Sequence, residues 1–177
     1  MKKTISIICL ALTFFLIYFL QSNFFTWFNI AGIMPNLYVI FILFISLFVK
    51  RKFGIIFGIC SGTYIDIVLG GSVGISALGL GIVGVLGEYL SKNFSKDSRF
   101  IIILMVCITT VVYETLTYIL SMLRLSGDIE ILAFLKILII EIIFNSLITI
   151  IIYPLIKKMG YYLENLFDDK IMMTRYF

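Results

Sequence analysis

The sequence predicts an all-α, polytopic membrane protein with six transmembrane helices. Three observations lead to this class. The chain of 177 residues is 62% hydrophobic and only 14% charged, and its mean hydropathy is +1.14. A water-soluble domain of this length needs more charged residues to cover its apolar surface. Several apolar runs approach the roughly 20 residues that cross a bilayer core. We therefore expect a single integral membrane domain over residues 1–177.

The first two apolar runs are expected to cross the membrane at about 4–20 and 35–49. Two lysines precede the first run, as in a signal peptide, but no small-x-small cleavage motif follows it. We therefore interpret this run as an uncleaved helix. The uncharged segment at 21–33 is rich in aromatic residues, which suits the membrane interface. Pro35 is a favourable first-turn residue for the second helix.

A row of small residues organises the third helix, expected at about 54–69, which precedes a fourth at about 73–90. The row repeats every four residues and consists of Gly54, Gly58, Gly62, Asp66, Gly70 and Gly74. Glycines at such spacing let two transmembrane helices approach closely. An aspartate in an apolar helix is costly and points to a function. We expect a close, glycine-rich hairpin between these helices and treat the row as a candidate groove for packing or for a partner.

The fifth and sixth spans are expected at about 100–123 and 131–156. Two lysines follow the sixth span, and in the tail at about 159–173 apolar and polar residues fall on opposite faces of a helix. We interpret this tail as an amphipathic helix on the membrane surface.

The basic residues give the expected orientation. Six spans place both termini on the same side of the membrane. Of the 14 basic residues, Arg124 and Lys136 fall on the opposite side, which leaves 12 on the side of the termini. Basic residues are enriched on the cytoplasmic side of membrane proteins. We therefore expect the N and C termini to be cytoplasmic.

Two ionisable residues are expected near the outer boundary of the membrane. Asp66 and Lys136 lie at similar depths when the helix rise of about 1.5 Å per residue is counted from the outer ends of their spans. They either form an ion pair or extend separately to the interface. Glu88 has a simpler explanation, because Lys92 follows it at the i+4 position of the same helix.

Glu114 and Glu141 are expected near mid-depth, where no basic residue lies. A carboxyl group at this level must be protonated, hydrogen-bonded or exposed to a cavity. One interpretation is structural hydrogen bonding to nearby polar groups, with Tyr64, Ser61 and Asn145 as candidates. The other is a ligand-binding cavity between the fifth and sixth spans.

The sequence lacks the residue sets of common catalytic and metal sites. There is no histidine, which removes the commonest general base and metal ligand. The three cysteines lie in separate apolar runs and are interpreted as buried thiols rather than as a disulfide or metal site. No HExxH, phosphate-binding loop or GxSxG motif occurs. An aspartyl protease needs two aspartates, and only Asp66 lies in a span. We expect no catalytic residue, no cofactor, no metal ion and no nucleic-acid partner.

The segment from about 35 to 80 carries a recognisable pattern. Pro35 and Asn36 open the second span, and a short basic turn follows it. Next come the glycine row from Gly54 to Asp66 and a Gly-Gly-x2-Gly turn that ends at Gly74. Together these features resemble the rod shape-determining protein MreD family of bacteria. Family members often carry an acidic residue where Asn36 stands here.

The resemblance implies a non-enzymatic component of the bacterial cell-wall elongation machinery, the elongasome, in the cytoplasmic (inner) membrane. The implied partners are an MreC-like bitopic protein, a RodA-type polymerase with its transpeptidase and, indirectly, MreB. The alternative is the substrate-binding S component of an energy-coupling-factor vitamin or metabolite importer, in which Glu114 and Glu141 would face the ligand. Such components usually carry an Ala-x3-Ala motif in the first helix, which here has only Ala11. A membrane-packing protein with another role is the third possibility.

Overall fold

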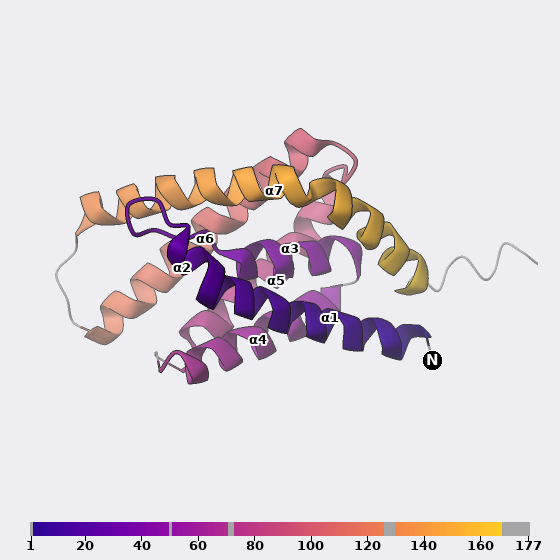
Figure 1. The fold of residues 1–177 in the computed structure, drawn as a ribbon, viewed down its shortest axis with the longest axis horizontal. Coiled ribbons are helices and arrows are strands. Elements are labelled where there is room, and N and C mark those ends of the chain that lie inside the picture. The colour runs from indigo at the N-terminus through magenta and orange to yellow at the C-terminus, as the bar shows by residue number, and fades with distance from the viewer. Residues whose placement is uncertain (1, 50, 71–72, 126–129, 168–177) are drawn as a thin grey trace, which may run out of the picture.

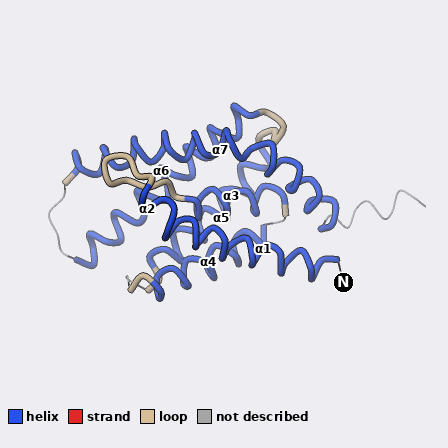
Figure 2. Tube along the Cα trace, viewed as in Figure 1, coloured by secondary structure: helices blue, strands red, loops and turns tan. Residues whose placement is uncertain are grey.

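The protein is a bundle of long helices (Figure 1). The computed structural model describes residues 2–49, 51–70, 73–125 and 130–167. Within these ranges the chain is helical apart from short connections, and no β-strand is present (Figure 2). The all-α prediction is thereby confirmed. Parts of the predicted turn (71–72), the predicted loop (126–129) and the predicted tail (168–173) lie outside the described residues.

The N-terminal helix is longer than expected. α1 (Lys2–Phe19) continues directly into a π-helical turn, η1 (Leu20–Phe24), and into the short α2 (Phe25–Trp27). A π-helical turn inside a longer helix is uncommon and often marks a functional position. Here the turn contains the glutamine that reaches the start of the next helix, as described below.

The helix α3 (Leu37–Phe48) is the centre of the molecule. All 12 of its residues are buried. It packs against each of the other long helices, which are α1, α4, α5, α6 and α7. Its sequence is almost entirely apolar, as complete burial in a membrane protein requires. A helix that is apolar on every side cannot show by periodicity which neighbour it contacts, and its central place is visible only in the structure.

The helices α4 (Arg51–Val68) and α5 (Ile75–Asn93) form the most extensive helix pair, and both also pack on α3. The chain reverses between them with Gly70 at φ +65° and Gly74 at φ +107°. Residues with a side chain rarely adopt this left-handed backbone conformation, so glycine is favoured at both positions.

The helices α6 (Arg99–Leu125) and α7 (Ile131–Phe167) complete the bundle. α7 continues through Pro154 and past the predicted end at 156, so the expected surface tail begins as the last turns of this helix. Its C-terminal end packs on the bundle, where Phe167 is buried and its ring lies 4.9 Å from that of Phe53. Proline is tolerated inside transmembrane helices because neighbouring groups can satisfy the freed carbonyl.

Four segments of the described chain are long and apolar enough to cross a membrane: Thr4–Trp27, Ile75–Asn93, Arg99–Arg124 and Ile131–Asn165. Two further apolar helices are shorter, Leu37–Phe48 and Phe53–Val68. The 12 residues of α3 rise only about 18 Å, whereas the hydrocarbon core measures about 30 Å. The multi-pass membrane character agrees with the prediction, whereas the number of crossings and the side of the termini stay predictions.

Candidate functional site: a buried polar cluster at the start of α3

Amide side chains from separate parts of the chain hold the start of α3. Asn36 is the N-cap, and its Oδ1 accepts a hydrogen bond from the backbone N–H of Val39 at 3.3 Å. The backbone N–H of Asn36 donates to Oδ1 of Asn145 on α7 at 2.7 Å. The N–H of Leu37 donates to Oε1 of Gln21 in η1 at 3.2 Å. The first N–H groups of a helix have no partner within that helix, and here amide oxygens serve this purpose.

Asn145 connects this helix start to α6. Its side chain is completely buried, and its Nδ2 donates to the hydroxyl of Thr110 at 3.0 Å. Thr110 is also completely buried. A single amide therefore joins α3, α6 and α7 through hydrogen bonds that are shielded from solvent, where such bonds are electrostatically strong.

Glu114 and Glu141, which the sequence predicts near mid-depth, complete the cluster. The carboxyl groups of Glu114 on α6 and Glu141 on α7 lie within hydrogen-bonding reach of each other and of Asn36. Two ionised carboxylates so close together in a membrane interior would repel each other. A proton shared between the two groups removes this repulsion and provides a donor. The pair can therefore hold a proton and act as hydrogen-bond donor and acceptor at the start of α3.

One oxygen in the cluster has spare capacity. Glu141 is only 5% exposed, and its Oε1 has no hydrogen-bond partner among the described residues. The hydroxyl of the fully buried Thr149, two turns further along α7, also has no hydrogen-bond partner among the described residues. This side of α7 therefore keeps unused polar atoms inside the protein.

The structure brings four predicted site residues together and leaves Lys136 apart. Asn36, Glu114, Glu141 and Asn145 meet at the start of α3. Asn145 was one of the three predicted partners of the glutamates. Tyr64, another of them, packs instead against Phe14, Phe15 and Tyr18 of α1. Lys136 is exposed on the first turns of α7.

Asp66 does not pair with Lys136, and that hypothesis was wrong. Its carboxylate is buried and accepts hydrogen bonds from the backbone N–H groups of Gly74 at 2.7 Å, Ser76 at 3.2 Å and Ala77 at 3.4 Å. These groups begin α5, so Asp66 caps the next helix from within α4. Backbone donors at a helix start are fixed in place and carry partial positive charge, whereas a lysine side chain would lose rotamer freedom by pairing.

The glycine row of α4 packs against the protein's own helices α5 and α3. A Cβ placed at Gly58 would overlap the carbonyl of Leu80, and one at Gly62 would overlap the backbone of Ala77. A Cβ at Gly54 would overlap the side chain of Ser46 on α3. The α4 row therefore faces α5 and α3 at backbone contact distance, and these contacts leave no room for a partner's helix between them.

Sequence reasoning missed Gln21, Thr110 and Ser76. Gln21 also donates from Nε2 to the carbonyl of Pro35 at 2.6 Å, and Ser76 lies within hydrogen-bonding reach of Tyr113. The available signal was that each is a polar residue at a position inside or beside an apolar run. Polarity alone does not show which residues meet across a bundle.

A second polar contact holds the other end of α7. The carboxylate of Asp97, in the connection between α5 and α6, accepts a hydrogen bond from the hydroxyl of Tyr161 at 2.7 Å and pairs with Lys157 at 3.1 Å. Lys96 pairs with Glu164 at 2.8 Å. The hydrogen bond from Tyr161, followed by the contact with Lys157, lowers the pKa of Asp97 below its usual value. This cluster fastens the connection to the C-terminal half of α7.

The comparisons with known proteins agree with the sequence pattern. A family model described as rod shape-determining protein MreD matches residues 1–160. No curated protein and no solved structure matches the chain significantly. The match includes all the members of the polar cluster and the whole glycine row.

Proposed function

Because the chain belongs to the MreD family of rod shape-determining proteins, we propose that it is a non-enzymatic membrane scaffold of the bacterial elongasome. The observation that carries this proposal is the family match over residues 1–160. In this role the protein binds an MreC-like bitopic protein and supports a RodA-type polymerase with its transpeptidase. MreB is connected to it indirectly.

The membrane placement belongs to the same proposal. Six helices cross or enter the bacterial inner membrane, with both termini cytoplasmic, as the distribution of basic residues favours. The α4–α5 hairpin packs along its glycines and gives the scaffold a firm interior. The short α3 then extends from the cytoplasmic side to about mid-depth, because its first turn lies beside Glu114 and Glu141.

The outer end of α7 is the surface that best suits a partner's transmembrane helix. Seven of the nine residues at 131–139 are exposed, and the two that are half-buried, Phe134 and Leu138, lie one turn apart on one face. Leu132 is 85% exposed and Ile139 is 57% exposed. The contact with α6 at this level includes the stacked rings of Tyr118 and Phe134, 4.4 Å apart. A helix end with so little intramolecular packing leaves room for a second helix to pack beside it.

Co-purification from native membranes in a mild detergent tests this function. The proposal predicts recovery of an MreC-like bitopic protein, with or without the polymerase pair. The double variant Leu132→Ser, Leu135→Ser should reduce that recovery. A matched change at Ile151, an exposed residue of the same helix, should not. Recovery of a cytoplasmic ATPase pair with a membrane coupling subunit would contradict the scaffold and favour an importer component.

A further inference from the structure

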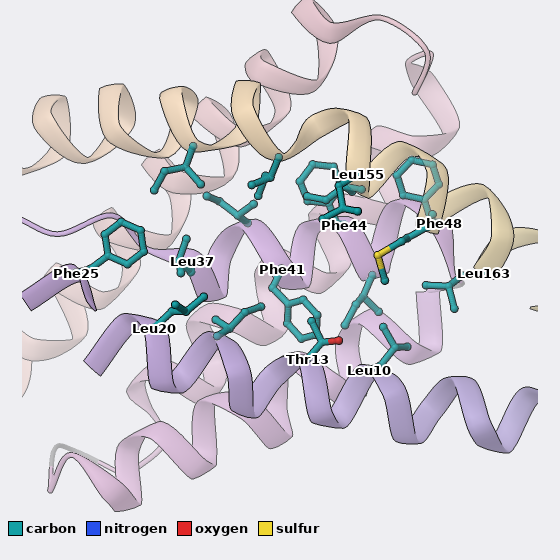
Figure 3. A pocket seen from close by; sticks show the side chains of 18 residues that line it. Leu10, Thr13, Leu20, Phe25, Leu37, Phe41, Phe44, Phe48, Leu155 and Leu163 are labelled. Carbon is teal, nitrogen blue, oxygen red and sulfur yellow. The ribbon is translucent and has the colours of Figure 1, made fainter. Parts of the chain in front are cut away.

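A narrow groove runs along α3 between α1 and α7 (Figure 3). Its volume is about 340 Å³. Phe41 and Phe44 of α3 form its floor, Leu10 of α1 lines one wall, and Leu155 and Leu163 of α7 line the other. α1 and α7 make only a few direct contacts with each other, so the groove opens sideways between them, toward the surroundings of the bundle.

The groove has no free polar group among the side chains that line it. Thr13 is the single lining residue with a hydroxyl, and it donates to the carbonyl of Cys9 in its own helix at 2.8 Å. The remaining lining residues are apolar. An occupant must therefore be apolar along the length that it inserts, because an inserted polar group would lose its hydrogen bonds.

The size of the groove selects among apolar occupants. Its floor extends from Leu37 to Phe48, which is about 18 Å at the rise of an α-helix. One leaflet of a bilayer provides about 15 Å of hydrocarbon. A helix with its side chains is about 10–12 Å wide, and α1 and α7 contact each other directly, so a third helix has no room to lie between them. A single extended hydrocarbon chain from one leaflet is close to the length of the groove.

The charge near one end indicates the kind of lipid. Lys158 is exposed on α7 between the lining residues Leu155 and Leu163. With the membrane placement proposed above, this is the cytoplasmic end of the groove, where lysines attract anionic headgroups. We propose that the groove binds one acyl chain of an anionic phospholipid from the cytoplasmic leaflet.

Photolabelling in vesicles tests this site directly. The full-length protein is reconstituted into phosphatidylethanolamine and phosphatidylglycerol, with a diazirine in the acyl chain of the phosphatidylglycerol, and the labelled residues are mapped by mass spectrometry. The proposal predicts several-fold more label on Phe41 and Phe44 than on Leu12 and Ile151. The first two are buried at 9% and 6% exposure, whereas the latter two are 63% and 74% exposed. Labelling in proportion to exposure would overturn the proposal.

Matched variants separate the groove from the general lipid surface. Ile152→Trp places a large ring at a half-buried position that lines the groove and should remove most of the label from Phe44. Ile151→Trp puts the same ring on the neighbouring residue, which is exposed and does not line the groove, and should leave the label in place. Equal labelling of the two variants would overturn the site. If Ile152→Trp fails to fold, the labelling pattern of the unaltered protein still decides the question.

The headgroup is tested separately. Lys158→Gln should lower the preference for labelled phosphatidylglycerol over labelled phosphatidylethanolamine by about fivefold, the effect of one cation near a membrane surface. An unchanged preference would overturn the anionic part of the proposal. Probe confined to the outer leaflet should not label Phe44, and labelling from that side would overturn the cytoplasmic placement. None of these measurements needs a partner protein, so they succeed or fail independently of the co-purification.

Discussion

The α4–α5 pair and the α1–α7 pair both lie against α3, but they do so in opposite ways. Gly58 and Gly62 bring α4 to backbone contact with α5, and no space remains between them. α1 and α7 carry large apolar side chains in the corresponding region and stay apart, which leaves the groove over α3. The comparison shows that small residues, more than hydrophobicity, determine which pairs of helices come into backbone contact. The α4–α5 pair is closed along its glycines, whereas the α1–α7 pair leaves the apolar groove that we propose holds an acyl chain.

The largest loss of stability is expected when a single methyl group is added between α4 and α5. In Gly62→Ala the new Cβ would lie closer than 3.0 Å to backbone atoms of Ser76 and Ala77, and backbone cannot move aside as a side chain can. We expect a loss of about 3 kcal/mol in the free energy of unfolding, at the upper end of overpacking costs. Unfolding by SDS in mixed detergent micelles measures this quantity.

The matched control lies on the facing helix. Gly81→Ala places its Cβ 3.1 Å from the flexible side chain of Ile59, which can shift. We expect no loss, or a gain of up to about 1 kcal/mol from helix propensity. Equal losses for Gly62→Ala and Gly81→Ala would mean that backbone contact does not distinguish this pair of helices.

The second effect concerns the cap between α4 and α5. Asp66→Ala leaves the N–H groups of Gly74, Ser76 and Ala77 without their acceptor, and we expect a loss of about 2 kcal/mol. Glu88→Ala removes an i,i+4 pair with the exposed Lys92 and should cost less than Asp66→Ala, about 1 kcal/mol at most. The same unfolding assay compares them. The reverse order would show that Asp66 is not a cap that the fold depends on.

A smaller effect is expected where α7 meets the start of α3. The hydrogen bond between Asn145 and Thr110 should contribute a coupling energy of about 1 kcal/mol. A double-mutant cycle with Asn145→Ala and Thr110→Val isolates this term, because each single variant removes the same bond. A coupling energy near zero would show that the cluster does not act as a unit.

The smallest effect is a pH dependence in the C-terminal half of α7. The pKa of Asp97 is lowered in the folded protein by the Tyr161 hydroxyl and by Lys157, so its contacts stabilise the fold above the unfolded-state pKa and are lost as the pH falls through the folded-state value. Hydrogen exchange in the turns around Lys157 should therefore speed up as the pH falls below about 4, relative to the rest of α7. In Asp97→Asn this additional change should disappear. If it persists, another group causes it.

Much of the fold follows from local rules that a single sequence displays. Apolar runs predict helices, and the glycines at 54, 58 and 62 predict a close helix contact because nothing else fits at that distance. The sequence does not show which helix packs against these glycines. The glycine row could equally have served a partner, and only the structure places α5 and α3 on it. The extent of α7 was also missed. Lys157 and Lys158 marked the expected end of the last span at 156, whereas the helix continues through both lysines to Phe167.

The polar cluster illustrates the limit of sequence reasoning. The unusual depth of Glu114 and Glu141 marked them as candidates, since carboxyl groups are costly in a membrane. Their neighbours were harder to find, because Asn36 and Asn145 are separated by 109 positions and α3 is apolar on all sides. A pairing so distant in sequence leaves no periodic signal. For Asp66, an ion pair with Lys136 was one of two predicted arrangements, but backbone N–H groups at the start of α5 satisfy its carboxylate instead.

The most direct test of the scaffold is site-specific photocrosslinking in native membranes. A photoactivatable amino acid is placed at Leu132, on the exposed N-terminal end of α7, or at Ile56, on the exposed face of α4. The account predicts a crosslink from Leu132 to an MreC-like bitopic protein. It predicts none from Ile56, because α4 packs against the protein's own α5 and α3 and is not the proposed partner surface. A bitopic partner captured from Ile56 and not from Leu132 would contradict it.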